Sequence, residues 1–592
     1  MLKLLKRMRK REALMALLCA VLVVAQVYFD LKLPDYMTRL TTLIKTPGSV
    51  TSDILSVGGE MLLCTLASAV LAVGCGYLAA KTASGFSFSV RADLFHHVMD
   101  AGSEEMQSFS VPSLITRTTN DITQIQMIVA MGLQMLMKAP IMAVWAIIKI
   151  LGKSWTLSAV TGGFVVVIVA VVLLIMSSCL PRFRQVQKKT DQINRVAREN
   201  LTGINVVHAF GAEDYQNRKF DGPSREMMNL QLKNQRLFAL LQPAMGLGMN
   251  GLALTIYWVG AALVESIALT DPAARLTMFT NVLVFSTYAT YVVMSFMMLV
   301  MIFMLVPQAQ VSAERINEVL ETENRIGEPA EPKPFTERAT VEMKNVSFRY
   351  PDADGYVLKD ISFRAKQGDT VAFIGATGSG KSTLVNLIPR FYDATAGTVL
   401  VDGLDVREYT FDALYNKLGY VTQKAVLFSG TVEDNVFFGQ SAAEKTDASL
   451  QAALSLSQAA EFVDKYPEKA AHPIAQLGRN VSGGQKQRLS IARALARTPE
   501  ILIFDDSFSA LDYKTDATLR EGLAKELPGT TKIIVAQRIS TIRNADQILV
   551  LDRGEIAGLG THDALMASCT VYREIAMSQL SEEELKKGGA SK

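Results

Sequence analysis

The sequence predicts an α-helical transmembrane domain with six spans, fused to an α/β domain with a P-loop. Three observations support this fold class. The first half alternates charge-free runs with charged loops, 49% of the 592 residues are apolar, and the second half carries a glycine-rich loop between a strand and a helix. We place the transmembrane domain at 1–320, a linker at 321–340, the α/β domain at 341–580 and a charged tail at 581–592.

Six apolar runs are each long enough to cross a bilayer, which takes roughly 20 apolar residues. They lie at 13–29, 61–80, about 122–150, 154–180, 237–264 and 276–313. No small-residue cleavage site follows the first run, so a cleaved signal peptide is not expected there. The five cysteines have no metal-binding spacing and are typical of buried apolar positions in a reducing context.

Lysines and arginines predict the orientation of these spans. Basic residues gather in the loop 181–236 and at the N-terminus, at Lys3, Lys6, Arg7, Arg9, Lys10 and Arg11. By the positive-inside rule both stretches face the cytoplasm, and six spans then return the second half to the same side. We therefore expect a multi-pass membrane protein with cytoplasmic N- and C-termini, for which the lipid bilayer is a partner.

Two lysines interrupt the third apolar run. Lys138 and Lys149 recur with Gln134 on one face of a predicted helix. Charged residues within a membrane are candidates for function, which would indicate an anionic or amphipathic substrate. The alternatives are a structural ion pair for Lys138 and a side chain that extends to the interface for Lys149. The sequence leaves these alternatives open.

A linker is predicted at 321–340 because the segment is polar and contains Pro329, Pro332 and Pro334. Beyond it, short β-branched strands, glycine turns and amphipathic helices are typical of a soluble α/β domain. The strand 371–374 precedes GATGSGKS at 375–382, which is the G-x-x-x-x-G-K-S pattern between a strand and a helix. Its glycines let backbone amides surround phosphates, and the helix N-terminus adds partial positive charge.

Individual roles follow from this loop. Lys381 is expected to reach the β- and γ-phosphates, and the Ser382 hydroxyl to bind magnesium. A second apolar strand, 501–504, ends at Asp505, a natural carboxylate partner for that ion. We therefore expect ATP and Mg²⁺ as cofactors, bound by Gly375, Thr377, Gly378, Ser379, Gly380, Lys381, Ser382 and Thr383.

One further stretch indicates a family. Ser482, Gly483, Gly484 and Gln485 open a predicted helix, a second anion-binding arrangement. The stretch resembles the signature motif of ABC transporters, in which two nucleotide-binding domains pair head to tail. Each ATP then lies between the P-loop of one chain and the signature of the other. The resemblance implies that Tyr350 stacks on adenine, that Gln423 is the Q-loop glutamine and a magnesium contact, and that 509–512 is the D-loop. The stretch 560–563 resembles a recurrent C-terminal feature of the family.

The membrane half resembles the six-helix type IV exporter fold, with an ABC ATP-binding domain fused at its C-terminus. Residues 113–121 and 198–210 resemble the two intracellular loops of that fold. By this resemblance each loop carries a short coupling helix that docks on a nucleotide-binding domain.

Two positions depart from the pattern of active family members. Asp506 stands where glutamate is usual, and its carboxylate is retracted by about 1.5 Å because the side chain lacks one methylene. Gln537 stands where histidine usually contacts the γ-phosphate. A water-orienting group must lie within hydrogen-bond reach of the attacking water. The sequence therefore predicts a site that binds ATP and hydrolyses it poorly.

By the same resemblance, the signature of this chain contacts only the ATP bound to the P-loop of a partner chain. We hypothesise a heterodimer in which a homologous half-transporter supplies the catalytic glutamate and histidine. The chain then resembles the degenerate-site subunit of heterodimeric bacterial multidrug-type exporters, which implies a translocase for amphipathic or drug-like compounds, lipids or peptides. The alternatives are an exporter-fold importer of the siderophore type, and a nucleotide-gated regulatory or channel subunit. Six spans disfavour a soluble ATPase of translation or DNA repair, so nucleic acid is not an expected partner.

Overall fold

The computed structural model describes residues 1–45, 50–267, 272–329, 331, 333–351, 353–440 and 445–579. The predicted tail at 581–592 and the linker residue Pro332 lie outside them. The chain forms two compact units. The first comprises Met1–Met99 and Phe109–Thr322, and the second comprises the described residues of Asp100–Ser108 and Glu323–Lys592.

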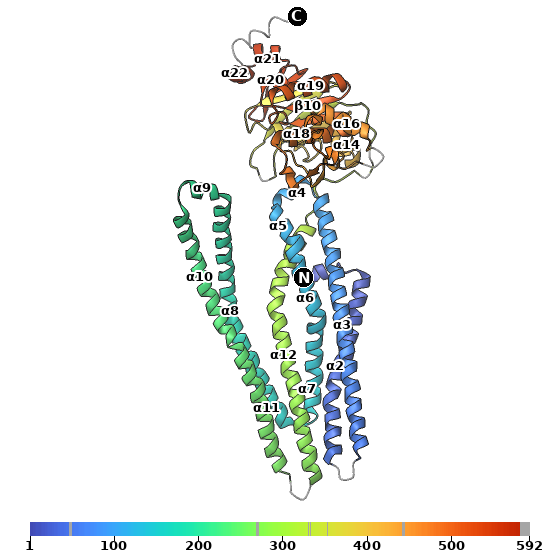
Figure 1. The fold of residues 1–592 in the computed structure, drawn as a ribbon, viewed down its shortest axis with the longest axis vertical. Helices are drawn as coiled ribbons and strands as arrows, with labels where there is room; N and C mark the ends of the chain where they lie inside the picture. Colours follow the sequence, from blue (N-terminus) through green and yellow to red (C-terminus); the bar gives the residue numbers. More distant parts are fainter. Residues whose placement is uncertain are drawn as a thin grey trace. The chain divides into compact units, whose positions relative to one another are not determined.

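The first unit is helical (Figure 1). Among the described residues, six helical segments are long and apolar enough to cross a membrane, which confirms the six predicted spans. The helices of this unit are α1 (Leu2–Leu5), α2 (Lys10–Lys45), α3 (Thr51–Asp100), α5 (Val111–Thr116), η1 (Arg117–Asp121), α6 (Ile122–Met131), η2 (Gly132–Leu136), α7 (Met137–Leu151), α8 (Trp155–Thr202), α9 (Ile204–Ala209), α10 (Glu213–Ala239), α11 (Leu241–Glu265) and α12 (Pro272–Leu320).

The third span is an interrupted helix. It runs from α5 to α7 through two π-helical turns, η1 and η2, and contains Pro140, which lacks a backbone N–H. Both lysines of this span have carboxylate partners on α2. Lys138 Nζ lies 3.0 Å from Asp30 Oδ2, and Lys149 Nζ lies 2.6 Å from Asp35 Oδ2. These ion pairs connect α7 with α2, and the Lys138–Asp30 pair is the less exposed of the two.

The expected intracellular loops have different structures. Residues 113–121 lie in α5 and η1 and continue the following helix, because Pro112 occupies the first turn of α5 after an extended Ser110. The turn before them holds α4 (Ser103–Ser108), which belongs to the second unit and whose Glu104 pairs with Arg325. At the other loop, the short α9 connects α8 to α10, and Figure 1 shows these two long helices running side by side up to it.

The described residues of the second unit form three sheets. Strands β1 (Val341–Phe348), β2 (Leu358–Ala365), β4 (Ala396–Val401) and β5 (Leu404–Asp405) form an antiparallel sheet in the order β2-β1-β4-β5. A six-stranded sheet has the order β12-β11-β3-β10-β9-β6 and is parallel except for β12. Its strands are β3 (Thr370–Gly375), β6 (Leu418–Val421), β9 (Ile501–Asp505), β10 (Thr531–Val535), β11 (Gln547–Asp552) and β12 (Glu555–Gly560). β7 (Gly430–Thr431) pairs with β8 (Pro473–Ile474).

Helices and a core cover both faces of the six-stranded sheet. Alternate residues of β3 enter opposite cores, with Phe373 in one cluster and Ala372 and Ile374 in the other. The helices of the second unit, besides α4, are α13 (Lys381–Asn386), α14 (Phe411–Lys417), α15 (Val432–Val436), α16 (Asp447–Leu456), α17 (Ala460–Val463), α18 (Gly483–Ala496), α19 (Tyr513–Glu526), α20 (Ile539–Ile542), α21 (His562–Ser568), α22 (Thr570–Gln579) and the 3-10 turns η3 (Val406–Glu408), η4 (Lys469–Ala471) and η5 (Gln476–Gly478). This packing fixes the carboxyl ends of β3, β9 and β10 next to one another.

Candidate functional site

The predicted P-loop joins β3 to α13 at the carboxyl edge of the parallel sheet. Gly375 packs so closely on β11 that a Cβ built there would lie 2.1 Å from the Leu551 carbonyl oxygen. Gly378 has a φ of +84°, and a Cβ at that position would meet no atom within 4 Å. The first glycine is therefore required by packing, and the second has open space beside it, so a phosphate can approach the backbone of the loop there.

Lys381 begins α13 and turns back over the loop. Its Nζ donates to the carbonyl oxygens of Gly375 and Ala376, each at 2.8 Å. Burial lowers the pKa of this amine, while the carboxylates of Asp505 and Asp506 act in the opposite direction. The cation is thus held by carbonyl groups of the loop, close to the expected position of the terminal phosphates.

Ser382 and Asp505 meet at the end of β9. The Ser382 hydroxyl donates to Asp505 Oδ1 at 2.8 Å. Burial raises the pKa of Asp505, and the Ser382 hydrogen bond lowers it in part. A hydroxyl and a single carboxylate suit Mg²⁺, which uses few protein ligands and takes the remainder from phosphates and water. Within the described residues no group of three or more acidic, histidine or cysteine side chains provides an all-protein metal cage.

Asp506 is the first of the two positions that depart from the family pattern. It is 7% exposed and has a φ of +48°. Gln537 Nε2 donates to Asp506 Oδ2 at 2.7 Å, and Gln423 Nε2 donates to the same oxygen at 3.2 Å. Two side-chain amides therefore share one oxygen of this short carboxylate.

Most residues of the predicted nucleotide site line one cavity of about 230 Å³. Its lining residues are Val357, Thr377, Gly378, Gly380, Lys381, Ser382, Thr383, Gln423, Asp506, Val535 and Gln537. Val357 and Val535 were not predicted. Val535 ends β10 beside the P-loop strand, so a buried strand ending at this edge was a usable signal. Val357 precedes β2 in an irregular segment, where no sequence pattern marks it.

Tyr350, predicted to stack on adenine, lies against the start of α13. Its hydroxyl is 3.1 Å from Thr383 Oγ1, and its ring packs edge-on against Phe348 and Tyr392. Tyr350 is thus close to the phosphate loop, in an aromatic cluster that fixes the plane of its ring.

The signature residues have a different environment. Ser482 caps α18 through a reciprocal pair of bonds, in which its Oγ accepts from Gln485 N and Gln485 Oε1 accepts from Ser482 N. Gly484 lies beside Ala510 of the D-loop, since a Cβ on it would be 3.4 Å from that carbonyl oxygen. Among the described residues that line the nucleotide cavity, none comes from 482–485. Within one chain, the P-loop and the signature therefore lie apart, as two separate predicted anion-binding sites.

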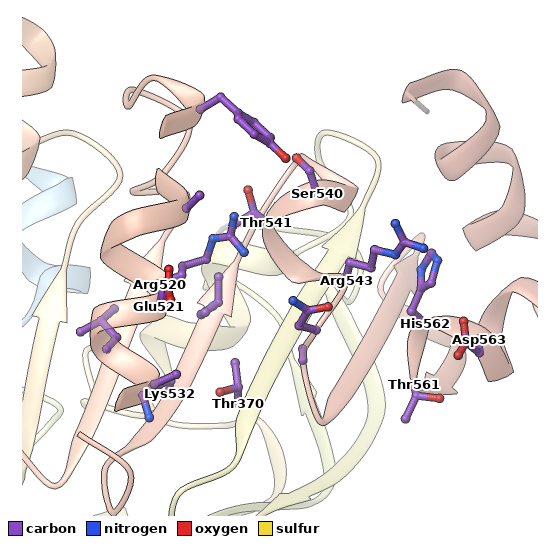
Figure 2. A pocket seen from close by; sticks show the side chains of 17 residues that line it. Thr370, Arg520, Glu521, Lys532, Ser540, Thr541, Arg543, Thr561, His562 and Asp563 are labelled. Carbon is purple, nitrogen blue, oxygen red and sulfur yellow. The ribbon is translucent and has the colours of Figure 1, made fainter. Parts of the chain in front are cut away.

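A larger cavity of about 920 Å³ lies at the opposite edge of the sheet (Figure 2). Its lining includes Thr370 and Lys532, which stand at the amino ends of β3 and β10. Ligands of open α/β sheets bind at the carboxyl ends. His562, from the C-terminal motif, also lines this cavity, but its Nδ1 lies 2.8 Å from the Tyr572 hydroxyl and burial lowers its pKa. We interpret His562 as a packing residue of α21 and α22.

Comparisons with known proteins identify the family of the chain. A family model described as "ABC transporter transmembrane region" matches residues 16–296, and one described as "ABC transporter" matches 358–509. An uncharacterized ABC transporter ATP-binding protein of Mycobacterium tuberculosis is 40% identical over 89% of this chain and 90% of its own length. The uncharacterized ABC transporter ATP-binding protein YfiB of Bacillus subtilis is 34% identical over 97% of this chain and 98% of its own.

Two further proteins extend the comparison. An ATP-dependent lipid A-core flippase of Syntrophus aciditrophicus is 31% identical over 86% of this chain and 84% of its own length. The solved structure of a bacterial Atm1-family ABC exporter with ATP bound superposes with a TM-score of 0.80. It covers 97% of this chain and all of that one, at 24% sequence identity. The chain therefore has the fold of an ABC exporter.

Proposed function

This chain belongs to the ABC transporter family, and from that premise we propose that it is one subunit of an ATP-driven heterodimeric exporter whose own nucleotide site binds ATP and hydrolyses it poorly. The family match supports ATP binding coupled to transport, and the exporter fold supports pairing with another half-transporter in a membrane. Beyond what the family match supports, the proposal adds the degenerate site, the heterodimer and the substrate class.

The Asp506–Gln537 hydrogen bond is the observation that carries the proposal. A group that orients or deprotonates the attacking water needs a free oxygen within hydrogen-bond reach of it. Asp506 is one methylene shorter than glutamate, and Gln537 and Gln423 both donate to its Oδ2, so the retracted Oδ1 is the oxygen left for a water. An amide, moreover, cannot carry the positive charge of a protonated histidine near the γ-phosphate. Both departures thus weaken the same step in the same cavity.

The groups expected to bind ATP and Mg²⁺, in contrast, are all present in this chain. The P-loop offers open space at Gly378, Lys381 lies beside that space, and Ser382 and Asp505 are suited to hold Mg²⁺. Bound Mg²⁺ would supply charge neutralisation at the phosphate oxygens. We propose that the site remains occupied by ATP and acts as a clamp or regulator, while Ser482–Gln485 complete the catalytic site of the partner.

The substrate class is inferred from the membrane half and from the relatives. Lys138 and Lys149 each have a carboxylate partner, so neither is an uncompensated cation that would select an anion by charge alone. A relative of this chain is a lipid A-core flippase by name. We therefore propose an amphipathic substrate, of the lipid or drug-like kind, exported across the bacterial cytoplasmic membrane, with both termini in the cytoplasm.

An ATPase assay of the purified full-length chain tests the proposal. The assay compares the chain alone with its complex with a half-transporter that carries glutamate and histidine at the two positions. We expect low turnover alone, robust turnover in the complex, and a loss of at least tenfold when Ser482→Ala is introduced into this chain. Robust turnover by the chain alone, abolished by Asp506→Asn, would contradict the proposal.

A further inference from the structure

The described residues that lead into the first span include five cations without a partner, of which Lys10 and Arg11 already belong to the first turn of α2. These basic residues, Lys6, Arg7, Arg9, Lys10 and Arg11, are all exposed. Within the described residues, none of these five side chains has a hydrogen-bond or ion-pair partner. We call residues 6–11 the basic segment. Like charges at such spacing repel one another, so the segment favours a counter-charge from outside the chain.

The basic segment is fixed at both of its ends. On the N-terminal side, Leu4 is fully buried, α1 packs against α12, and Lys3 Nζ lies 3.1 Å from Glu321 Oε1. On the C-terminal side, Glu12 is 6% exposed and is committed to internal bonds, accepting from Ser89 Oγ at 3.2 Å and from the Arg9 backbone N–H at 3.0 Å. Glu12 therefore forms no ion pair with the five cations, and the basic segment together with Glu12 keeps a net charge of +4.

The position of the basic segment identifies its partner. The apolar run of α2 begins at residue 13, two positions after Arg11, so the cations stand at the border of a membrane span. Figure 1 shows the N-terminus at the end of α2. Basic residues next to a span interact with anionic lipid headgroups at the membrane surface, and the interaction decays within a Debye length of about 10 Å.

We propose that the basic segment is a docking surface for anionic phospholipid headgroups of the adjacent leaflet, independent of the nucleotide site. Its five cations occupy positions 6, 7, 9, 10 and 11 and line neither of the two cavities described above, which suits several headgroups on a surface. A single soluble phosphate would need converging donors. The surface ties the start of α2 to the charge of the membrane.

Native mass spectrometry of the full-length chain, titrated with phosphatidylglycerol or phosphatidylcholine, tests this proposal. We expect tighter binding of phosphatidylglycerol, weakened when salt is raised. Each neutralised arginine is expected to weaken that binding roughly fivefold, so Arg7→Gln with Arg11→Gln lowers it roughly 25-fold and leaves phosphatidylcholine binding unchanged. The conservative variant, Arg7→Lys with Arg11→Lys, is expected to retain the preference because a point charge suffices.

The matched control is Arg218→Gln with Arg225→Gln on α10. Both arginines are exposed and lie about 28 Å and 18 Å along the helix before residue 237, where the next apolar run begins, beyond the reach of headgroup charge. Equal losses in the control and in the Arg7/Arg11 variant, or no loss in the latter with its fold intact by circular dichroism, would overturn the proposal. Displacement of phosphatidylglycerol by millimolar inorganic phosphate would also overturn it, in favour of a soluble anion.

Discussion

Asp506 and Gln537 are joined by a hydrogen bond, so a substitution at one position changes the contacts available to the other side chain. A glutamate at position 506 alone would still meet the Gln537 amide, and a histidine at 537 alone would still face a retracted carboxylate. The residues are also fixed by their strands, since Asp506 N donates to the Val535 carbonyl at 3.1 Å. We therefore expect their effects on hydrolysis to be strongly non-additive.

Reversal of both substitutions tests this coupling. We expect Asp506→Glu with Gln537→His to raise single-turnover ATP hydrolysis by this chain's site about 100-fold, the usual contribution of a positioned general base. Each single variant is expected to give less than a tenfold gain. Asp412→Glu, an exposed site on α14, is the control for the added methylene. Full activity in Asp506→Glu alone would show that Gln537 is not part of the defect.

Asp505 gives the nucleotide site a pH dependence. Burial raises its pKa above the ordinary value of 3.8, and only the deprotonated form binds a cation well. The protonated fraction grows as pH falls through the raised pKa, so Mg²⁺-dependent ATP affinity is expected to weaken at a higher pH than for an ordinary aspartate. Fluorescent ATP titrations from pH 7.5 to 5, with Mg²⁺ and with EDTA, measure this. The same pH profile in both series would argue against the role of Asp505.

At the scale of elements, α2 is held to α7 by charge as well as by packing. Lys138 and Asp30 have side chains only 20% and 19% exposed, and the Tyr288 hydroxyl of α12 donates to Asp35 at 2.7 Å. Removing one partner of such a pair leaves an uncompensated charge in a poorly hydrated place, whereas removing both does not. The pairs therefore specify which faces of the three helices meet.

A double-mutant cycle on the Lys138–Asp30 pair measures this. We expect Lys138→Gln to destabilise the bundle by roughly 3 kcal/mol, and the addition of Asp30→Asn to recover much of that loss. Lys219→Gln removes an exposed ion pair with Glu199 and is expected to cost at most about 1 kcal/mol. Denaturant unfolding in detergent provides the measurement. Additive effects of the two substitutions would mean that the ion pair contributes nothing specific.

The structural role of Ser482 as a helix cap can be distinguished from its expected role in the partner's nucleotide site. Ser482 of α18 and Thr446 of α16 both form reciprocal capping boxes. We expect Ser482→Ala and Thr446→Ala each to lower the stability of the second unit by about 1 kcal/mol. Only Ser482→Ala is expected to reduce the turnover of the complex. Similar losses of activity in both variants would indicate that stability alone accounts for the effect.

Much of this organisation could be predicted from periodicity and motif order. The six apolar spans are confirmed, and the P-loop stands between β3 and α13 as its spacing indicates. The turn at α4 was missed because Pro112 restarts a helix within a motif that resembles a loop. The bonds of Asp506 could not be predicted, because Gln423 and Gln537 meet it only through the parallel pairing of β6, β9 and β10.

At the scale of the whole molecule, the proposed function gives one chain two halves of different nucleotide sites. Its P-loop cavity contains Asp506 and Gln537, and its signature lies outside that cavity. If the site of this chain hydrolyses ATP poorly, as proposed, two identical copies would combine two weak sites. A partner with glutamate and histidine would create one strong and one weak site, so we expect the complex to hydrolyse ATP at one site while retaining it at the other.

The identity of the nucleotide retained on this chain tests the central claim most directly. The assembled complex is incubated with Mg²⁺ and 8-azido-ATP labelled on the α-phosphate, crosslinked by light after many turnovers, and separated into its two chains. We predict that the label recovered from this chain is chiefly triphosphate, while the label on the partner is chiefly diphosphate. Diphosphate on this chain, appearing as fast as on the partner, would contradict the account.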